Sequence, residues 1–153
     1  MDKIIHLEAR LKCDPSRAYA MFTENARLES WLAAKADVEP HVGGKYELFW
    51  QPDTPEDNST LGCKVTAVAQ GALIAFEWRG PVQFKPFMNH ADPLTHVVVS
   101  FATCADGGTP CTDVHLIHTG WRNSPEWEAA REYFVKAWGS ALESLKQCIN
   151  NPS

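Results

Sequence analysis

The sequence has no apolar run that approaches the roughly 18 residues of a membrane span, and its N-terminus lacks the long apolar core of a signal peptide. It also has no basic stripe, because 14 lysines and arginines are interspersed with 19 acidic residues for a net charge of −5. Nucleic acid is therefore not an expected partner. The five cysteines form no C-x-x-C pair, which suits a reducing compartment. We expect a cytoplasmic protein without a membrane span.

Several chemical motifs are also missing. No G-x-S-x-G nucleophile motif and no phosphate-binding glycine loop occurs. His115 and His118 are three apart on an expected strand and face opposite sides, while His96 and His115 share a face but lie roughly 13 Å apart. We therefore predict no metal site and no cofactor. The acidic strand residues fall on the face opposite the apolar ones, so no catalytic residue is assigned.

The size and composition are those of one globular domain. The chain has 153 residues, of which 44% are hydrophobic and 22% charged. At this length folding buries roughly 68–70% of the surface, so no disulfide or metal is needed to hold the fold together. No repeat or linker divides the sequence, and a single domain over residues 1–153 is predicted.

The strongest pattern is a helix over residues 124–150. Ser124 is a suitable N-cap, and Pro125 suits the first helical position. At 100° per residue the apolar side chains fall in one broad arc. They are Trp127, Ala130, Phe134, Ala137, Trp138, Ala141, Leu142, Leu145, Cys148 and Ile149. Arg131 interrupts this arc, so the helix is expected to lie along a large apolar surface with one polar exception.

The rest of the chain predicts one strand, two short helices and then six strands. Alternating residues favour a half-buried strand over 3–13, and shorter apolar patterns favour helices over 17–22 and 26–32. The later strands are expected at 36–40, 45–50, 60–68, 72–79, 95–104 and 111–121. Consecutive hairpins of this kind form an antiparallel sheet. We predict an α+β fold in which a curved sheet of about seven strands wraps around the long helix.

The last two strands allow a register to be predicted. A two-residue turn at Gly107-Gly108 pairs residues whose numbers sum to 215, so Val97 opposes His118 and Val99 opposes Leu116. These partners share a face, which makes the register self-consistent. The same register places Cys104 opposite Cys111. A disulfide is conceivable there, but the expected compartment favours free thiols.

A long connection over residues 80–93 leaves two interpretations open. It is too rich in aromatic residues for disorder, with Val82, Phe84, Phe87 and Met88 within it. It either folds over a binding site as a lid or forms a small satellite core under a loop.

Motifs spread along the chain resemble a known family. They include Pro15 with Ala18, Thr23, Trp31-Leu32, Gly43-Gly44-x-Tyr46, Gly62, Phe76-x-Trp78 and the run from Thr112 to Trp121. The sequence resembles the helix-grip (START/SRPBCC) superfamily of START lipid-transfer domains, polyketide cyclases and Hsp90-ATPase-activator homologue (AHSA1-like) domains. It is most similar to the last group. The resemblance implies a hydrophobic cavity between the sheet and the long helix.

The resemblance and the strand phases together suggest the residues of a binding site. Those expected to line the cavity are Tyr46, Leu48, Trp50, Phe76, Trp78, Val97, Val99, Leu116 and His118 from strands, and Arg131, Phe134 and Trp138 from the helix. His118 and Arg131 each lie roughly 9–10 Å from the same corner of the fold. They either form the polar end of the cavity and receive a ligand carboxylate or carbonyl, or Arg131 pairs with an acid at the rim while His118 bonds backbone.

The preferred hypothesis is binding of a small hydrophobic or amphipathic molecule without chemistry. One alternative is a cyclase- or dehydratase-type enzyme that uses His118 and Tyr46 as acid–base groups. Another is a module that interacts with an Hsp90-type chaperone. The eukaryotic activator carries a further N-terminal domain that does much of the chaperone binding, so chaperone activation is not the expected role. A homodimer stays open.

Overall fold

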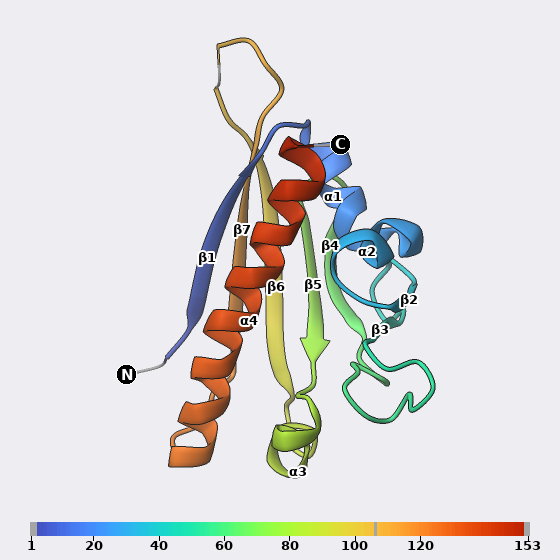
Figure 1. Ribbon diagram of the computed structural model, residues 1–153, viewed down its shortest axis with the longest axis vertical. Coiled ribbons are helices and arrows are strands. Elements are labelled where there is room, and N and C mark those ends of the chain that lie inside the picture. Colours follow the sequence, from blue (N-terminus) through green and yellow to red (C-terminus); the bar gives the residue numbers. More distant parts are fainter. Residues whose placement is uncertain (1–2, 106, 152–153) are drawn as a thin grey trace.

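A long helix, α4 (Pro125–Asn150), crosses one face of an antiparallel sheet in this computed structural model, which describes residues 3–105 and 107–151 (Figure 1). Before α4 the chain forms β1 (Ile5–Leu11), α1 (Pro15–Thr23), α2 (Asn25–Trp31), β2 (Lys35–Val38), β3 (Tyr46–Phe49), β4 (Val65–Ala69), β5 (Leu73–Trp78), the 3₁₀ turn η1 (Val82–Phe84), α3 (Lys85–Met88), β6 (Thr95–Thr103) and β7 (Thr112–Thr119). The predicted α+β fold and order of elements are confirmed.

The seven strands divide into two ladders. Five form the main sheet in the order β1-β7-β6-β5-β4, and β2 pairs separately with β3. The chain after β3 continues beside it without forming a regular ladder. It is held there by hydrogen bonds such as the one that the Tyr46 amide donates to the Cys63 carbonyl at 2.8 Å. Gly62, with a φ of 86°, turns the backbone there. We expected one sheet of about seven strands, but the strands form a five-stranded sheet and a separate pair. The regular strand pairing is interrupted at the turn that Gly62 makes.

The predicted β6–β7 register is confirmed. Val97 lies opposite His118 and Val99 opposite Leu116. Gly107 and Gly108 both have positive φ, as a tight hairpin turn requires. The expectation of free thiols at Cys104 and Cys111 is wrong, because the two form a disulfide. Their Cα atoms are 5.2 Å apart at the end of the ladder, within the range that a disulfide requires.

Helix α4 begins as its sequence predicts, and both of its ends contact residues that flank β1. The Ser124 hydroxyl accepts from the Trp127 amide at 3.2 Å. Near that end, Lys3 forms an ion pair with Glu128 at 2.6 Å. Near the other end, the Asn150 side chain accepts from the Lys12 amide at 2.8 Å. The buried side chains of α4 are Ala130, Phe134, Trp138, Leu142, Leu145 and Ile149, all from the predicted apolar arc.

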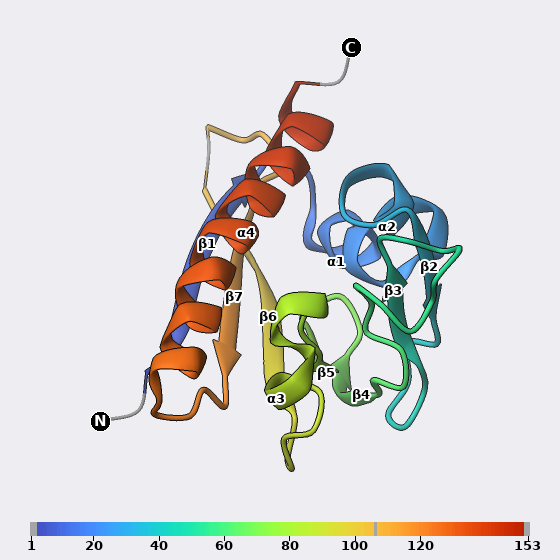
Figure 2. The ribbon, with the colours of Figure 1, turned by 60° about the horizontal axis from the view of Figure 1, so that its bottom comes forward.

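Helices α1 and α2 lie beside the C-terminal half of α4, and β2 packs against α2 (Figure 2). Asp14 caps α1 by accepting from the Arg17 amide at 2.9 Å. The Trp31 indole N–H donates to the Met21 carbonyl at 2.8 Å and joins the two helices. No helix in the described ranges combines the length and the apolar character that a membrane crossing needs.

The long connection after β5 folds into η1 and α3 and packs on the N-terminal half of α4. Met88 is fully buried, the Phe84 ring contacts Tyr133, and the Phe87 ring contacts Trp127. This small aromatic cluster is the satellite core that one of the two interpretations predicts. The start of the connection also reaches the pocket described next.

Candidate binding pocket

A pocket of about 620 Å³ lies beside α4, bounded by α2, the chain after β3 and the chain after β5. Its described lining residues are Trp31, Leu32, Trp50, Gln51, Asn58, Ser59, Trp78, Arg79, Gly80, Pro81, Gln83, Tyr133, Phe134, Ala137, Trp138, Ser140, Ala141 and Ser144. The volume is that of a typical small-molecule site.

Three tryptophans form a continuous wall of the pocket. The Trp78 ring lies 4.9 Å from that of Trp138 and 6.0 Å from that of Trp50, centroid to centroid. Trp50 is 38% exposed, and its indole N–H donates to the Leu32 carbonyl at 2.8 Å. The buried indole N–H of Trp78 has no hydrogen-bond partner among the described residues. The wall is therefore formed by aromatic rings, and it contains one hydrogen-bond donor without a partner among the described residues, the Trp78 indole N–H.

Small side chains on α4 leave room for the pocket. Ala137, Ala141 and Ser144 recur at the i, i+4, i+7 spacing that places them on one helix face. Trp31 and Leu32, at the end of α2, lie on the pocket's other side. Larger residues at the two alanines would fill this space.

One charge borders the pocket. Arg79 is the single charged residue among the described lining residues, and its Nη1 donates to the Asn89 carbonyl at 3.1 Å. Gln51, Asn58 and Gln83 add neutral polar groups. The described lining of the pocket thus combines aromatic side chains with one charged residue.

The predicted site residues separate into two groups. Trp50, Trp78, Phe134 and Trp138 line the pocket. The others on the strands lie in the closed core between sheet and helix, each at most 1% exposed: Tyr46, Leu48, Phe76, Val97, Val99, Leu116 and His118. The space expected to be a cavity is filled at those positions by their own side chains, and the pocket opens to one side of it.

His118 is enclosed by aromatic rings. The Trp138 indole N–H donates to its Nδ1 at 3.0 Å, so the neutral ring carries its proton on Nε2. That Nε2 is buried without a partner in the described ranges. Burial, with a smaller contribution from the charge of His96, lowers the pKa of His118 to about 3. His118 is a neutral core group at physiological pH.

Arg131 is not the counterpart of His118. Its guanidinium forms an ion pair with Glu128, one turn back on α4. The helix residues whose rings face His118 are Phe134 and Trp138. Hydrogen bonds from Arg131 and then Lys3 lower the pKa of Glu128 to about 2. Of the two interpretations of Arg131, the structure therefore agrees with the one in which it pairs with an acid at the rim.

Tyr46, like His118, is buried in the core and does not line the pocket. Its hydroxyl donates to the Phe22 carbonyl at 2.7 Å, and its ring stacks on Phe76 at 3.7 Å. Burial raises the pKa of Tyr46 above its ordinary value. Neither Tyr46 nor His118 is among the described residues that line the pocket.

Sequence reasoning missed most of the polar pocket residues. Arg79 follows an apolar strand, and nothing local marks it as part of a site. The small residues at 137, 141 and 144 were a usable signal, because three short side chains on one face of an otherwise bulky helix leave a gap.

An antiparallel sheet covered by one long C-terminal helix, with two short helices after the first strand, is the helix-grip fold of the SRPBCC superfamily. The family model described as "Activator of Hsp90 ATPase homolog 1-like protein" matches residues 12–150, and the chain belongs to this family.

Solved structures agree with that assignment at the level of the fold. A protein from Mesorhizobium loti has 20% identity and a TM-score of 0.76, with 99% of each chain covered. The Aha1 dimer from Colwellia psychrerythraea has 18% identity and a TM-score of 0.73, with 97% of each chain covered. An HSP90 activator from Plasmodium falciparum has 18% identity and a TM-score of 0.68, covering 95% of this chain and 94% of that one. No curated protein matches the sequence.

Proposed function

We propose that this protein binds an apolar molecule with an anionic head group, such as a carboxylate, in the pocket beside α4, without chemical conversion. The observation that carries the proposal is the position of Arg79 as the single charge on the described, largely aromatic lining. Arg79 would receive the head group, and the walls formed by Trp50, Trp78 and Trp138 would contact the apolar body.

The unused donor in the wall supports the proposal. A buried N–H without a partner costs about 1–3 kcal/mol, so native proteins rarely keep one. The Trp78 indole N–H is such a group, and Trp78 lines the pocket. A ligand oxygen that accepted from it would remove this cost, which favours a ligand that carries an acceptor close to its apolar body.

The first experiment tests the pocket by filling it. Ala137→Phe places a phenyl ring in the lining, and Ala129→Phe makes the same change at an exposed position of α4 outside the lining. With the fluorescent sulfonate 8-anilinonaphthalene-1-sulfonate as probe, Ala137→Phe should weaken binding at least about tenfold, a loss of 1.4 kcal/mol. Ala129→Phe should bind like the parent. Equal binding by all three proteins, with unchanged near-UV circular dichroism, would overturn the pocket as the site.

The second experiment tests the charge. Dodecanoate and 1-dodecanol are matched in chain length and compete for the fluorescent probe. Arg79→Met should weaken dodecanoate at least about tenfold and leave dodecanol within about twofold, whereas Arg79→Lys should retain the preference for the acid. Binding of dodecanol also reports that the variant is folded. Equal loss of both competitors would show that Arg79 supports the structure and does not select the ligand.

The two alternative functions have less support. For the enzyme, the acid–base pair His118 and Tyr46 would have to reach a substrate from the closed core. The chaperone role rests on the family description and on the names of structures under 25% identical, which show the fold. Since one of those structures is a dimer, we also propose that this chain forms a homodimer. Light scattering should then give twice the monomer mass, and a monomer across the micromolar range would refute it.

A further inference from the structure

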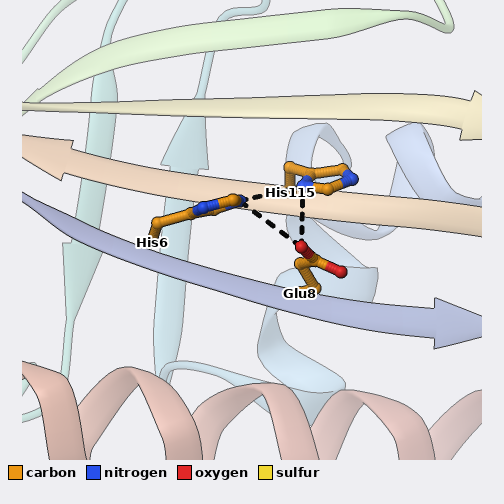
Figure 3. Close-up of side chains that lie close together, drawn as sticks. All are labelled: His6, Glu8 and His115. Carbon is orange, nitrogen blue, oxygen red and sulfur yellow. Dashed lines mark hydrogen bonds and ion pairs between the residues drawn. The ribbon is translucent and has the colours of Figure 1, made fainter.

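On the sheet face turned away from α4, three potential metal ligands converge. His6 and Glu8 alternate along β1 and share its outer face, and Glu8 lies directly opposite His115 on β7. Figure 3 shows the three side chains directed toward one another from these two neighbouring strands. We propose that His6, Glu8 and His115 form a binding site for a divalent transition-metal ion, a role independent of the pocket beside α4.

The distances between the ligand atoms suit one shared ion. His6 Nε2 lies 2.9 Å from His115 Nδ1, and Glu8 Oε1 lies 3.8 Å from the first and 3.7 Å from the second. Zinc bound tetrahedrally at roughly 2.0–2.1 Å separates neighbouring ligand atoms by roughly 3.3 Å. The three observed distances bracket that value. Each distance would have to change by about half an ångström or less to reach it.

The chemistry of the set selects the class of ion. Two imidazole nitrogens and one carboxylate oxygen suit Zn²⁺, Ni²⁺, Co²⁺ or Cu²⁺, whereas Ca²⁺ and Mg²⁺ prefer oxygen ligands. The side chains of His6, Glu8 and His115 are 43%, 66% and 35% exposed. An ion can therefore enter from solvent, and water can complete its coordination shell.

Two features of the fold position the ligands. The β1–β7 ladder keeps regular register through all seven residues of β1, so the backbone positions from which the three side chains extend are set by the ladder. The His6 and His115 rings stack with centroids 5.2 Å apart and a 27° angle between their planes. Because β1 is an edge strand of the five-stranded sheet, a bound ion would fasten that edge to its neighbour.

The competing account is a metal-free hydrogen bond between the two imidazoles, which the 2.9 Å separation also allows. The two accounts differ in one measurable property. A hydrogen-bonded pair needs no cation, whereas a metal site binds one and loses affinity when any one of its ligands is removed.

The test uses the full-length protein without an affinity tag, titrated with zinc sulfate in a calorimeter. The parent should bind one equivalent and gain thermal stability. His6→Gln, Glu8→Gln and His115→Gln should each weaken binding at least tenfold and remove the thermal shift. His90→Gln, which alters an exposed histidine outside the cluster, should bind like the parent.

A spectroscopic measurement provides a second readout. Cobalt(II) added to the parent should give the visible ligand-field bands of a low-coordinate site, and the His115→Gln protein should give the spectrum of the aqueous ion. The proposal is overturned if the parent takes up no stoichiometric zinc, or if all three ligand variants bind zinc as tightly as the parent, as they would if zinc bound at the free cysteines Cys13, Cys63 or Cys148.

Discussion

The indole N–H of Trp138 donates to Nδ1 of His118 at 3.0 Å, and this hydrogen bond joins the long helix to strand β7 inside the core. Both side chains are at most 3% exposed. A buried polar contact of this kind also selects one tautomer of His118 and fixes the angle of the Trp138 ring. Since that ring forms part of the pocket wall, the bond connects the stability of the core to the shape of the pocket.

Trp138→Phe should therefore lower the free energy of unfolding by more than the loss of side-chain volume alone would. The change leaves His118 Nδ1 buried without a donor, and we expect the free energy of unfolding to fall by about 2–4 kcal/mol. Urea denaturation followed by far-UV circular dichroism measures it. Trp127→Phe is the matched control on the same helix, because Trp127 is half-buried and contacts Phe87 and Trp121. A loss no larger than that of the control would show that the hydrogen bond contributes little.

The lowered pKa of His118 predicts a pH dependence of stability. The folded-state pKa is about 3, and that of a histidine in an unfolded chain is about 6.5. Between these values the unfolded chain binds a proton that the folded chain excludes. The stabilisation is therefore complete above about pH 6.5 and declines as the pH falls toward 3, by at most about 1.4 kcal/mol per pH unit.

His118→Gln isolates this contribution. Glutamine retains an amide acceptor for Trp138 but does not titrate, so the variant should be less stable at pH 7 and should lose stability more slowly between pH 6.5 and 5. The measurement is urea unfolding at half-unit steps of pH, with His90→Gln as the control at an exposed position. Parallel pH curves for the parent and His118→Gln would contradict the assignment.

The β6–β7 hairpin explains why much of the fold could be predicted. Two consecutive glycines fix the turn, the turn fixes the register, and the register directs Val97, Val99 and His118 inward. The N-cap and the apolar face of α4 are likewise determined by residues within residues 124–150. In each case residues close in sequence determine the outcome.

The charged residue of the pocket and the cluster of His6, Glu8 and His115 could not be predicted in the same way. His6 and His115 meet only because β1 pairs with β7, and no turn or spacing in the sequence specifies that long-range pairing. Arg79 lines the same pocket as residues of α2 and α4, which are distant from it in the sequence. The Glu128–Arg131 pair is different, because its i, i+3 spacing is visible in the sequence and would have indicated a partner for the arginine.

Glu128 predicts a second acid-sensitive effect, at lower pH than that of His118. The ordinary pKa of a glutamate is 4.5, and that of Glu128 in the folded protein is about 2. The hydrogen bond from Arg131 lowers it most, and the hydrogen bond from Lys3 comes next. A depressed acid pKa stabilises the fold fully above pH 4.5, and the effect is lost as the pH falls to 2. The parent should therefore melt at a higher temperature than Glu128→Gln at pH 6, with the difference vanishing near pH 2.

Differential scanning calorimetry across this range tests the prediction, and added salt should reduce the difference at pH 6. Glu143→Gln is the matched control, since Glu143 pairs with Lys146 at the same i, i+3 spacing and both side chains are well exposed. If both variants shift the melting temperature equally, the contacts of Glu128 with Lys3 and Arg131 stabilise the fold no more than an exposed ion pair does.

Two glycines should respond in opposite directions to the same substitution. Gly139 lies on the exposed face of α4, and an added Cβ would meet nothing within 4 Å. Gly139→Ala should therefore raise the free energy of unfolding by about 0.5–1 kcal/mol, because alanine loses less conformational entropy in a helix. At Gly80 a Cβ would lie 2.6 Å from the Met88 sulfur and 3.2 Å from the Phe84 Cβ. Gly80→Ala should lower stability by about 1–3 kcal/mol through overpacking.

The pair is compared by urea denaturation of both variants beside the parent. Because Gly80 also lines the pocket, Gly80→Ala should change binding of the fluorescent sulfonate as well, whereas Gly139, outside the described lining, should leave it unchanged. A Gly80→Ala protein as stable as the parent would mean that Met88 and Phe84 can move aside, and that the aromatic cluster after β5 is less tightly packed on α4 than its contacts indicate.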